Sequence, residues 1–174
     1  MRELPITEGW NVLDDNLLAC SEGHIRAVFE MLGRQPNPIE FTGGWEAKRL
    51  EDWHVELLLG IRLGAVWFAY DENADLEPLV EAGKKLLAAG ISTTKSGNVS
   101  HRCRCYCLIG WPMDTLEAAE HRLRMAYANG FFPMAMLYRD SKGETSYEWR
   151  RFQKFWARPA AINRICRDRT KART

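Results

Sequence analysis

The chain has 174 residues, of which 46% are hydrophobic and 27% charged, and its formal net charge is +1. This length suits a single domain with its own core, and the composition excludes a disordered chain. The near balance of charge provides no global field for nucleic acid or a membrane, so we expect neither as a partner. The apolar runs are too short for a membrane span and the N-terminus has no signal core, so the expected location is cytoplasmic.

Five segments rich in apolar, β-branched and aromatic residues are interpreted as strands. In chain order they are residues 10–19, 38–42, 65–70, 102–111 and 133–138. The segments between them have apolar residues at helical spacing, which predicts helices around residues 25–32, 50–61, 76–87 and 116–127. The stretch 91–101 is polar and is expected to be a loop.

Glycines and capping residues mark the expected ends of these helices. The glycines expected to stop a helix are Gly33, Gly64, Gly90 and Gly130. Ser21 is a candidate N-cap of the first helix, and Asp114 with Glu117 fits a capping box before the fourth.

Strands that alternate with helices of this length favour parallel pairing, in either a barrel or a doubly wound sheet. After the last strand, residues 147–158 are expected to form a helix that ends before Pro159. Its aromatic residues Trp149, Phe152, Phe155 and Trp156 are interpreted as a core-packing stripe, in preference to a nucleic-acid surface interleaved with basic residues. We therefore predict one domain over residues 1–158 and a basic C-terminal tail over residues 159–174.

Polar residues and glycines follow the expected strands, where parallel α/β folds place their ligand sites. Asp14, Asp15 and Asn16 lie within the first apolar segment, where carboxylates are costly to bury unless they bind a ligand or cap a turn. Gly43 and Gly44 either let backbone approach a ligand or make a strand-to-helix turn. Glu46 is a candidate ligand group or a partner of a helix dipole.

The run CRCYC at residues 103–107 resembles a metal motif but is interpreted as core. Alternate residues of a strand lie about 6.6 Å apart, whereas two thiolates on one zinc must lie within about 4.6 Å. Cys103, Cys105 and Cys107 are therefore expected to be small buried apolar side chains. The four histidines show no metal-binding spacing, so no protein metal site is predicted.

Five segments taken together resemble the later half of a radical S-adenosylmethionine (radical SAM) barrel, most closely the Fe-S oxidoreductase-like proteins of phages and bacteria. They are WNVLDDNLLA, EFTGGWEAKRL, AVWFAYDE, RCYCLIGWPMDTLEAAEHRL and NGFFPMAMLYRD, and they span most of residues 10–158. The resemblance implies an α/β fold, a partial (β/α) barrel of about five parallel strands with helices outside and a C-terminal helix. It also implies that the strand ends hold SAM, which a [4Fe-4S] cluster cleaves to a deoxyadenosyl radical.

By this resemblance, the positions facing SAM or substrate are Asp14, Asn16, Gly43, Gly44, Tyr70, Asp71, Gly110 and Trp111. The family's CxxxCxxC loop has no counterpart in this sequence, so the chain alone is expected to be inactive and its first barrel units to be absent. A cluster-bearing partner segment or a homo-oligomer is expected to complete it. The substrate, a small molecule or a peptide, is not specified by the fold.

Two other functions fit the same residues. One is a non-catalytic interaction protein derived from the barrel. The other is a βα-barrel enzyme that binds a divalent metal through Asp14, Asp15 and Asp71.

Overall fold

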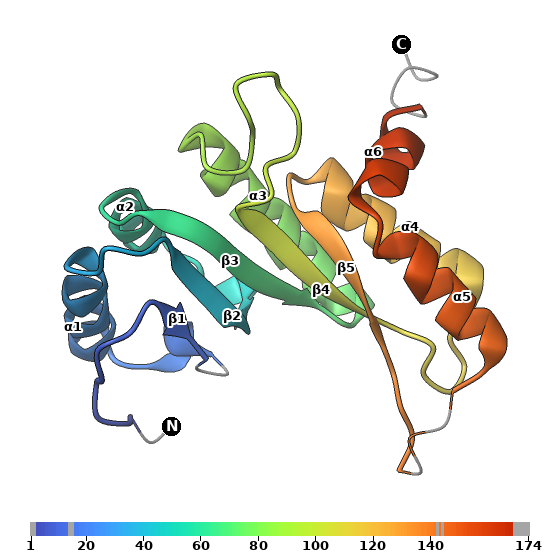
Figure 1. Ribbon diagram of the computed structural model, residues 1–174, viewed down its shortest axis with the longest axis horizontal. Coiled ribbons are helices and arrows are strands. Elements are labelled where there is room, and N and C mark those ends of the chain that lie inside the picture. Colours follow the sequence, from blue (N-terminus) through green and yellow to red (C-terminus); the bar gives the residue numbers. More distant parts are fainter. Residues whose placement is uncertain (1–2, 14–15, 142, 144, 169–174) are drawn as a thin grey trace.

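The computed structural model describes residues 3–13, 16–141, 143 and 145–168 and has an α/β fold with one five-stranded sheet (Figure 1). The strands are β1 (Asn11–Val12), β2 (Ile39–Glu46), β3 (Leu63–Tyr70), β4 (Cys103–Ile109) and β5 (Phe132–Leu137). The α-helices are α1 (Glu22–Gly33), α2 (Asp52–Leu59), α3 (Leu76–Ala88), α4 (Leu116–Ala128), α5 (Tyr147–Trp156) and α6 (Pro159–Asp168).

The strands follow one another across the sheet in chain order, β1-β2-β3-β4-β5, and every neighbouring pair is parallel. Right-handed crossovers in a sheet of sequential order place the connecting helices on the same face. In Figure 1, α3 accordingly passes behind β3 and β4. This arrangement confirms the predicted class, a parallel α/β sheet with flanking helices of the kind found in a partial β/α barrel.

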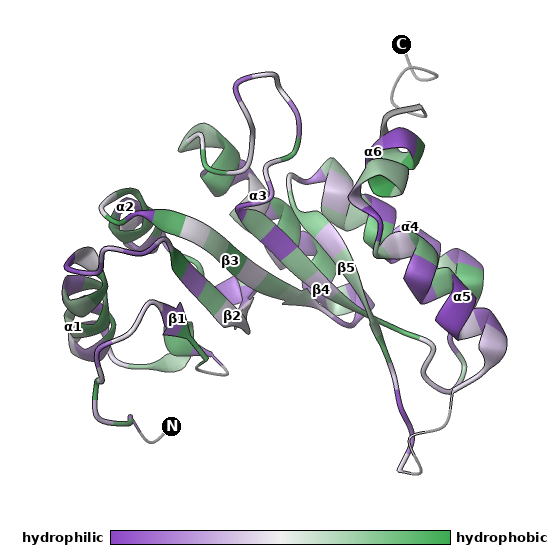
Figure 2. Cartoon of the chain, viewed as in Figure 1, coloured by the Kyte–Doolittle hydropathy of each residue, from purple (hydrophilic) through white to green (hydrophobic). Residues whose placement is uncertain are grey.

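The core lies between the sheet and its helices. One alternate set of strand residues points into it, including Phe41, Val66, Phe68 and Cys105, each with no exposed area. The helices contribute the apolar sides of their amphipathic faces, which appear as alternating green and purple bands in Figure 2. No helix in the described ranges has the length and apolar character needed to cross a lipid bilayer.

Two strands and one cap differ from the sequence-based expectations. The first strand covers only Asn11–Val12, and Leu17–Ala19 forms a 3-10 helix instead. Gly64 lies inside β3 instead of ending a helix. A Cβ there would come within 3.0 Å of Pro38 Cβ and 3.1 Å of the Ile39 carbonyl oxygen, so the close approach of β2 favours glycine. Ser21 caps α1 as expected. Thr115, and not Asp114, caps α4 by accepting a hydrogen bond from the Ala118 amide at 3.1 Å.

The C-terminal residues form two helices, of which α5 packs against β5 and α6 packs against α4 and α5. Pro159 follows the end of α5, as predicted, but it also begins α6, because proline is well suited to the first turn of a helix. Residues 159–168 of the predicted tail are therefore helical. Gln153 of α5 donates a hydrogen bond to the Ala135 carbonyl oxygen at 3.2 Å, which satisfies a polar group of the edge strand.

Candidate functional site

The carboxyl ends of all five strands lie along one edge of the sheet because the strands are parallel. At this edge two hollows meet at Asp71, the residue that follows β3. Asp71 lines both of them, so we take it as the centre of the candidate site.

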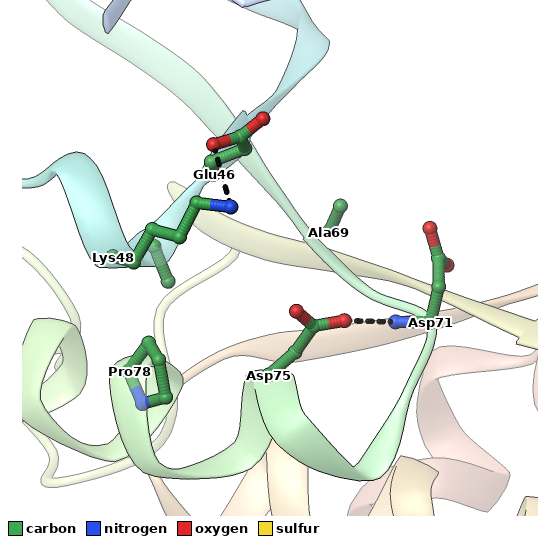
Figure 3. Close-up of a pocket in the computed structure, with 7 residues that line it drawn as sticks. Glu46, Lys48, Ala69, Asp71, Asp75 and Pro78 are labelled. Carbon is green, nitrogen blue, oxygen red and sulfur yellow. Dashed lines mark hydrogen bonds and ion pairs between the residues drawn. The ribbon is translucent and has the colours of Figure 1, made fainter.

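The smaller hollow lies between the ends of β2 and β3 (Figure 3) and has a volume of about 160 Å³. Glu46, Lys48 and Ala69 line one side of it, and Asp71 and Asp75 line the other. The Asp75 carboxylate accepts hydrogen bonds from the amides of Asp71 and Glu72, each at 3.0 Å. Asp75 thus fixes the turn after β3, and Figure 3 shows the Asp71 carboxylate pointing away from it.

The larger hollow lies between the turns that follow β3 and β4 and has a volume of about 540 Å³. Its lining residues are Asp71, Glu72, Asn73, Leu108, Trp111, Met113, Asp114, Ala118 and Arg122. Pockets of about 300 to 1,000 Å³ are typical of small-molecule sites. This hollow is therefore large enough for a ligand of the size of a nucleoside or an amino-acid derivative.

The carboxyl groups of Glu46 and Asp71 have opposite pKa shifts. Arg49 donates a hydrogen bond to Glu46 at 2.8 Å and Lys48 lies 3.2 Å away, and these contacts lower the pKa of Glu46. Asp71 is exposed along one side, yet the flanking protein displaces part of its water, and this desolvation raises its pKa. Glu46 is thus already paired, whereas Asp71 gains most from a cationic ligand.

Arg122 forms the floor of the larger hollow. Its side chain is 5% exposed, and its Nη2 atom lies 2.8 Å from Asp114 Oδ2 and 3.1 Å from the Leu108 carbonyl oxygen. Its guanidinium lies 4.1 Å from the Trp111 ring centroid, in cation–π contact. Asp114 also accepts a hydrogen bond from the Gly110 amide at 2.8 Å. This network fixes the turn after β4 against α4. The fixed turn and the contact with Arg122 hold Trp111 beside the hollow.

The sequence did not single out Arg122, although a signal for it exists. Arg122 lies three residues after Ala119 and four before Ala126, so it falls on the apolar stripe of α4, whose members are fully buried. A charged residue on a buried stripe needs a partner of opposite charge. That partner is Asp114, which the sequence pattern assigned to helix capping. A local pattern does not show that the Arg122 side chain reaches the turn after β4, where Asp114 lies.

The structure brings together three of the predicted site residues, at the ends of β3 and β4. Asp71 and Trp111 line the same hollow, and Gly110 is bonded to Asp114 at its margin. Gly110 adopts φ +76°, and a Cβ there would come within 2.9 Å of the Trp149 ring. Glycine at position 110 therefore allows the backbone conformation of the turn and its close packing against Trp149 of α5.

Gly43 and Gly44 lie within β2 and not in a turn after it. The register with β3 shifts between Phe41 and Trp45, so the two glycines belong to a β-bulge, and Gly44 has φ +80°. A Cβ on Gly44 would lie 3.6 Å from the Tyr106 ring, whose hydroxyl donates to the Thr42 carbonyl oxygen at 3.3 Å. The group that approaches this backbone is thus the Tyr106 side chain.

Two further residues of the predicted set, Tyr70 and Asn16, line neither hollow. Tyr70 is 1% exposed and packs in the core on the helix side of the sheet, where burial raises the pKa of its hydroxyl. Asn16 is buried before the short 3-10 helix. Asp14 and Asp15 lie outside the described residues, so the acidic cluster of the first segment is not placed.

The three cysteines of β4 are core residues, as the sequence predicts. Cys103, Cys105 and Cys107 have no exposed area, and burial raises the pKa of Cys103 to about 12. Within the described ranges, no group of three or more His, Cys, Asp or Glu side chains is arranged to hold a metal ion.

Comparisons of the chain with protein-family models, with curated proteins and with solved structures find no match. The candidate site is therefore defined by its geometry and by the chemistry of its residues.

Proposed function

We propose that this chain is the SAM- and substrate-binding portion of a radical SAM enzyme of the Fe-S oxidoreductase-like type. The observation that carries the proposal is the position of Asp71 and Trp111 at the carboxyl ends of adjacent parallel strands, beside a hollow of about 540 Å³. This is where a ligand binds in parallel α/β folds. The sequence segments that resemble the radical SAM family supply the choice of ligand.

The residues at this edge suit a cationic ligand. SAM carries a sulfonium and an ammonium group, and the Asp71 carboxylate, which forms no salt bridge with another described residue, is the natural acceptor for one of them. Trp111 offers an aromatic ring at the same hollow, which suits an adenine or a sulfonium group. In this proposal Asp71 binds and orients the ligand, and Arg122 positions Trp111.

The cysteines of the described chain do not fit an iron–sulfur cluster. A [4Fe-4S] cluster of this family needs three thiolates, and the three cysteines of β4 point into the core with raised pKa values for Cys103 and Cys105. Activity would therefore require a segment outside these 174 residues that carries the cluster. We assign no reaction step to the residues described here.

Calorimetric titration with SAM tests the proposal. We expect the wild-type chain to bind SAM and Asp71→Asn to bind at least tenfold more weakly, because a charge-assisted bond is lost. Asp52→Asn is the matched control, since the Asp52 side chain is 84% exposed, pairs with Lys85 and lines neither hollow. Wild-type protein that binds no SAM under any condition would favour a non-catalytic interaction protein instead.

The pH dependence of binding gives a second test. Asp71 must be ionised to bind a cation, and its pKa is raised mainly by desolvation. We expect the affinity for SAM to fall as the pH drops toward and through this raised pKa. Asp71→Asn should lack this fall, and an identical profile in both proteins would exclude Asp71 as the binding carboxylate.

A further inference from the structure

The charges of this chain are divided between an acidic body and a basic C-terminal end. Residues 147–174 contain nine Lys or Arg and two Asp or Glu, whereas the preceding 146 residues contain 15 and 21. The formal net charge of +1 therefore hides a strong asymmetry. An asymmetry of this kind indicates a polyanionic partner at the basic end.

The structure shows that α5 separates its aromatic residues into two groups. Trp149, Phe152 and Trp156 pack toward the core, as the predicted stripe requires, and Trp156 is only 1% exposed. Phe155 is the exception, because it is 41% exposed. Tyr147, at the start of the same helix, is 76% exposed. Two aromatic rings of α5 are therefore available to a partner.

The exposed cations of α5 lie on the same side as these rings. At 100° per residue, Arg150, Lys154 and Arg151 span about 100° of the helix surface, and Tyr147 falls between them. All three cations are exposed, and none forms a salt bridge with another described residue. Figure 2 shows this part of α5 as strongly hydrophilic.

We propose that the outer face of α5, formed by Tyr147, Arg150, Arg151, Lys154 and Phe155, binds single-stranded nucleic acid. The three cations contact phosphates, and the two rings stack on bases. This combination of a basic surface with exposed aromatic side chains is the usual form of a sequence-tolerant single-strand site. Base pairing and stacking in a duplex would hide the base faces from these rings, so a single strand is favoured.

Two observations argue against other functions for this surface. An amphipathic helix binds a membrane through its apolar face, but the apolar residues Trp149, Phe152 and Trp156 of α5 are already packed against the core, and α5 also contacts α6. The surface also shares no residue with either hollow at Asp71, so it is independent of SAM binding. Arg158 and Arg164, which follow α5 in the chain, are also exposed.

Fluorescence anisotropy with a labelled oligothymidylate of about 16 nucleotides tests the proposal on the full chain. We expect wild-type protein to bind, with an affinity that falls steeply as salt is raised. Arg150→Gln, Arg151→Gln and Lys154→Gln combined should weaken binding by about tenfold to a hundredfold at 0.1 M salt and reduce the salt slope by about 2. Tyr147→Ala should weaken binding by about fivefold or more at every salt concentration.

The matched control is the combined change of Lys84, Lys95 and Arg102 to Gln, which removes three exposed cations from the acidic body. We expect it to leave binding within about twofold of wild type, because these residues lie outside the proposed surface. All variants should keep the wild-type circular dichroism spectrum, since every replaced side chain is exposed. Equal losses in the two triple variants would show a nonspecific charge effect and overturn the proposal. Binding to phosphatidylserine vesicles without binding to the oligonucleotide would also overturn it.

Discussion

The two faces of the sheet are built from the same strands but are covered in different ways. On the helix side, Phe68 has no exposed area and packs against Phe131 at 5.0 Å and Trp45 at 5.9 Å between ring centroids. On the other face, Trp67 is 8% exposed and is covered by Tyr106, stacked at 4.3 Å, and by Arg104 at 4.9 Å. A side chain can thus be buried inside the core shared by the sheet and its helices, as Phe68 is, or only by its neighbours on the same face, as Trp67 is.

The difference shows what each face contributes to the fold. Helix-side residues belong to one connected core, whereas Trp67 does not belong to it. Met134 and Met136 of β5 are 41% and 43% exposed, at register positions opposite Tyr106 and Leu108. Apolar side chains gathered on an exposed face often mark a site of association. We therefore still expect self-association or a partner at this face, which sedimentation at micromolar concentration can measure.

Alanine at positions 67 and 68 compares the two faces directly. Phe68→Ala should lower the free energy of unfolding by about 3 to 5 kcal/mol, because helices and sheet cannot collapse into the cavity. Trp67→Ala should cost only about 2 kcal/mol, because Tyr106 and Arg104 can move and water can enter. Urea denaturation of both variants measures the difference. Equal losses would mean that both faces are equally rigid cores.

The pH dependence of stability tests how completely the helix-side face excludes water, because the cysteines of β4 are buried there. The pKa of Cys103 is raised by burial to about 12, above that of the unfolded chain, so the thiol stays protonated in the folded protein. Its contribution to stability is complete below pH 9 and is lost as the pH rises toward 12, with a slope of about 1.4 kcal/mol per pH unit. Cys103→Val should reduce this alkaline loss, as measured by urea denaturation between pH 8 and about pH 10. The same slope in wild type and variant would mean that the thiol is not desolvated.

A substitution in the bulge of β2 tests how rigid the other face is, because Gly44 lies next to the Tyr106 ring there. Gly44→Ala should lower the free energy of unfolding by about 1 to 2 kcal/mol, because Gly44 has φ +80°, which is unfavourable for alanine. Gly33→Ala is the control, since Gly33 ends α1 without a positive φ and has open space around its Cβ position. That variant should be neutral or slightly more stable. A neutral Gly44→Ala would show that the bulge adapts.

The smallest expected effect is that of the cation above Trp67. Arg104→Gln removes the cation–π contact but leaves the Trp67–Tyr106 stack in place. We expect a loss of about 0.5 to 1 kcal/mol in thermal or urea unfolding. A loss above about 2 kcal/mol would mean that Arg104 is needed to hold the whole covering layer.

The sequence by itself determined the order of strands and helices, because apolar periodicity reports which side of an element is buried. It also determined that the cysteines of β4 are core residues, since alternate strand positions lie too far apart to share a metal. Ser21 was predicted correctly as a cap because capping depends on residues three apart.

Only the tertiary structure decided the contacts between residues distant in sequence. Asp114 pairs with Arg122 instead of capping α4, and Tyr106 reaches across β3 to the Thr42 carbonyl oxygen. The outward position of Phe155 was decided by the packing of α5 against β5 and α6. Such contacts depend on how the elements pack and on the register of the strands, and local sequence patterns carry no information on either.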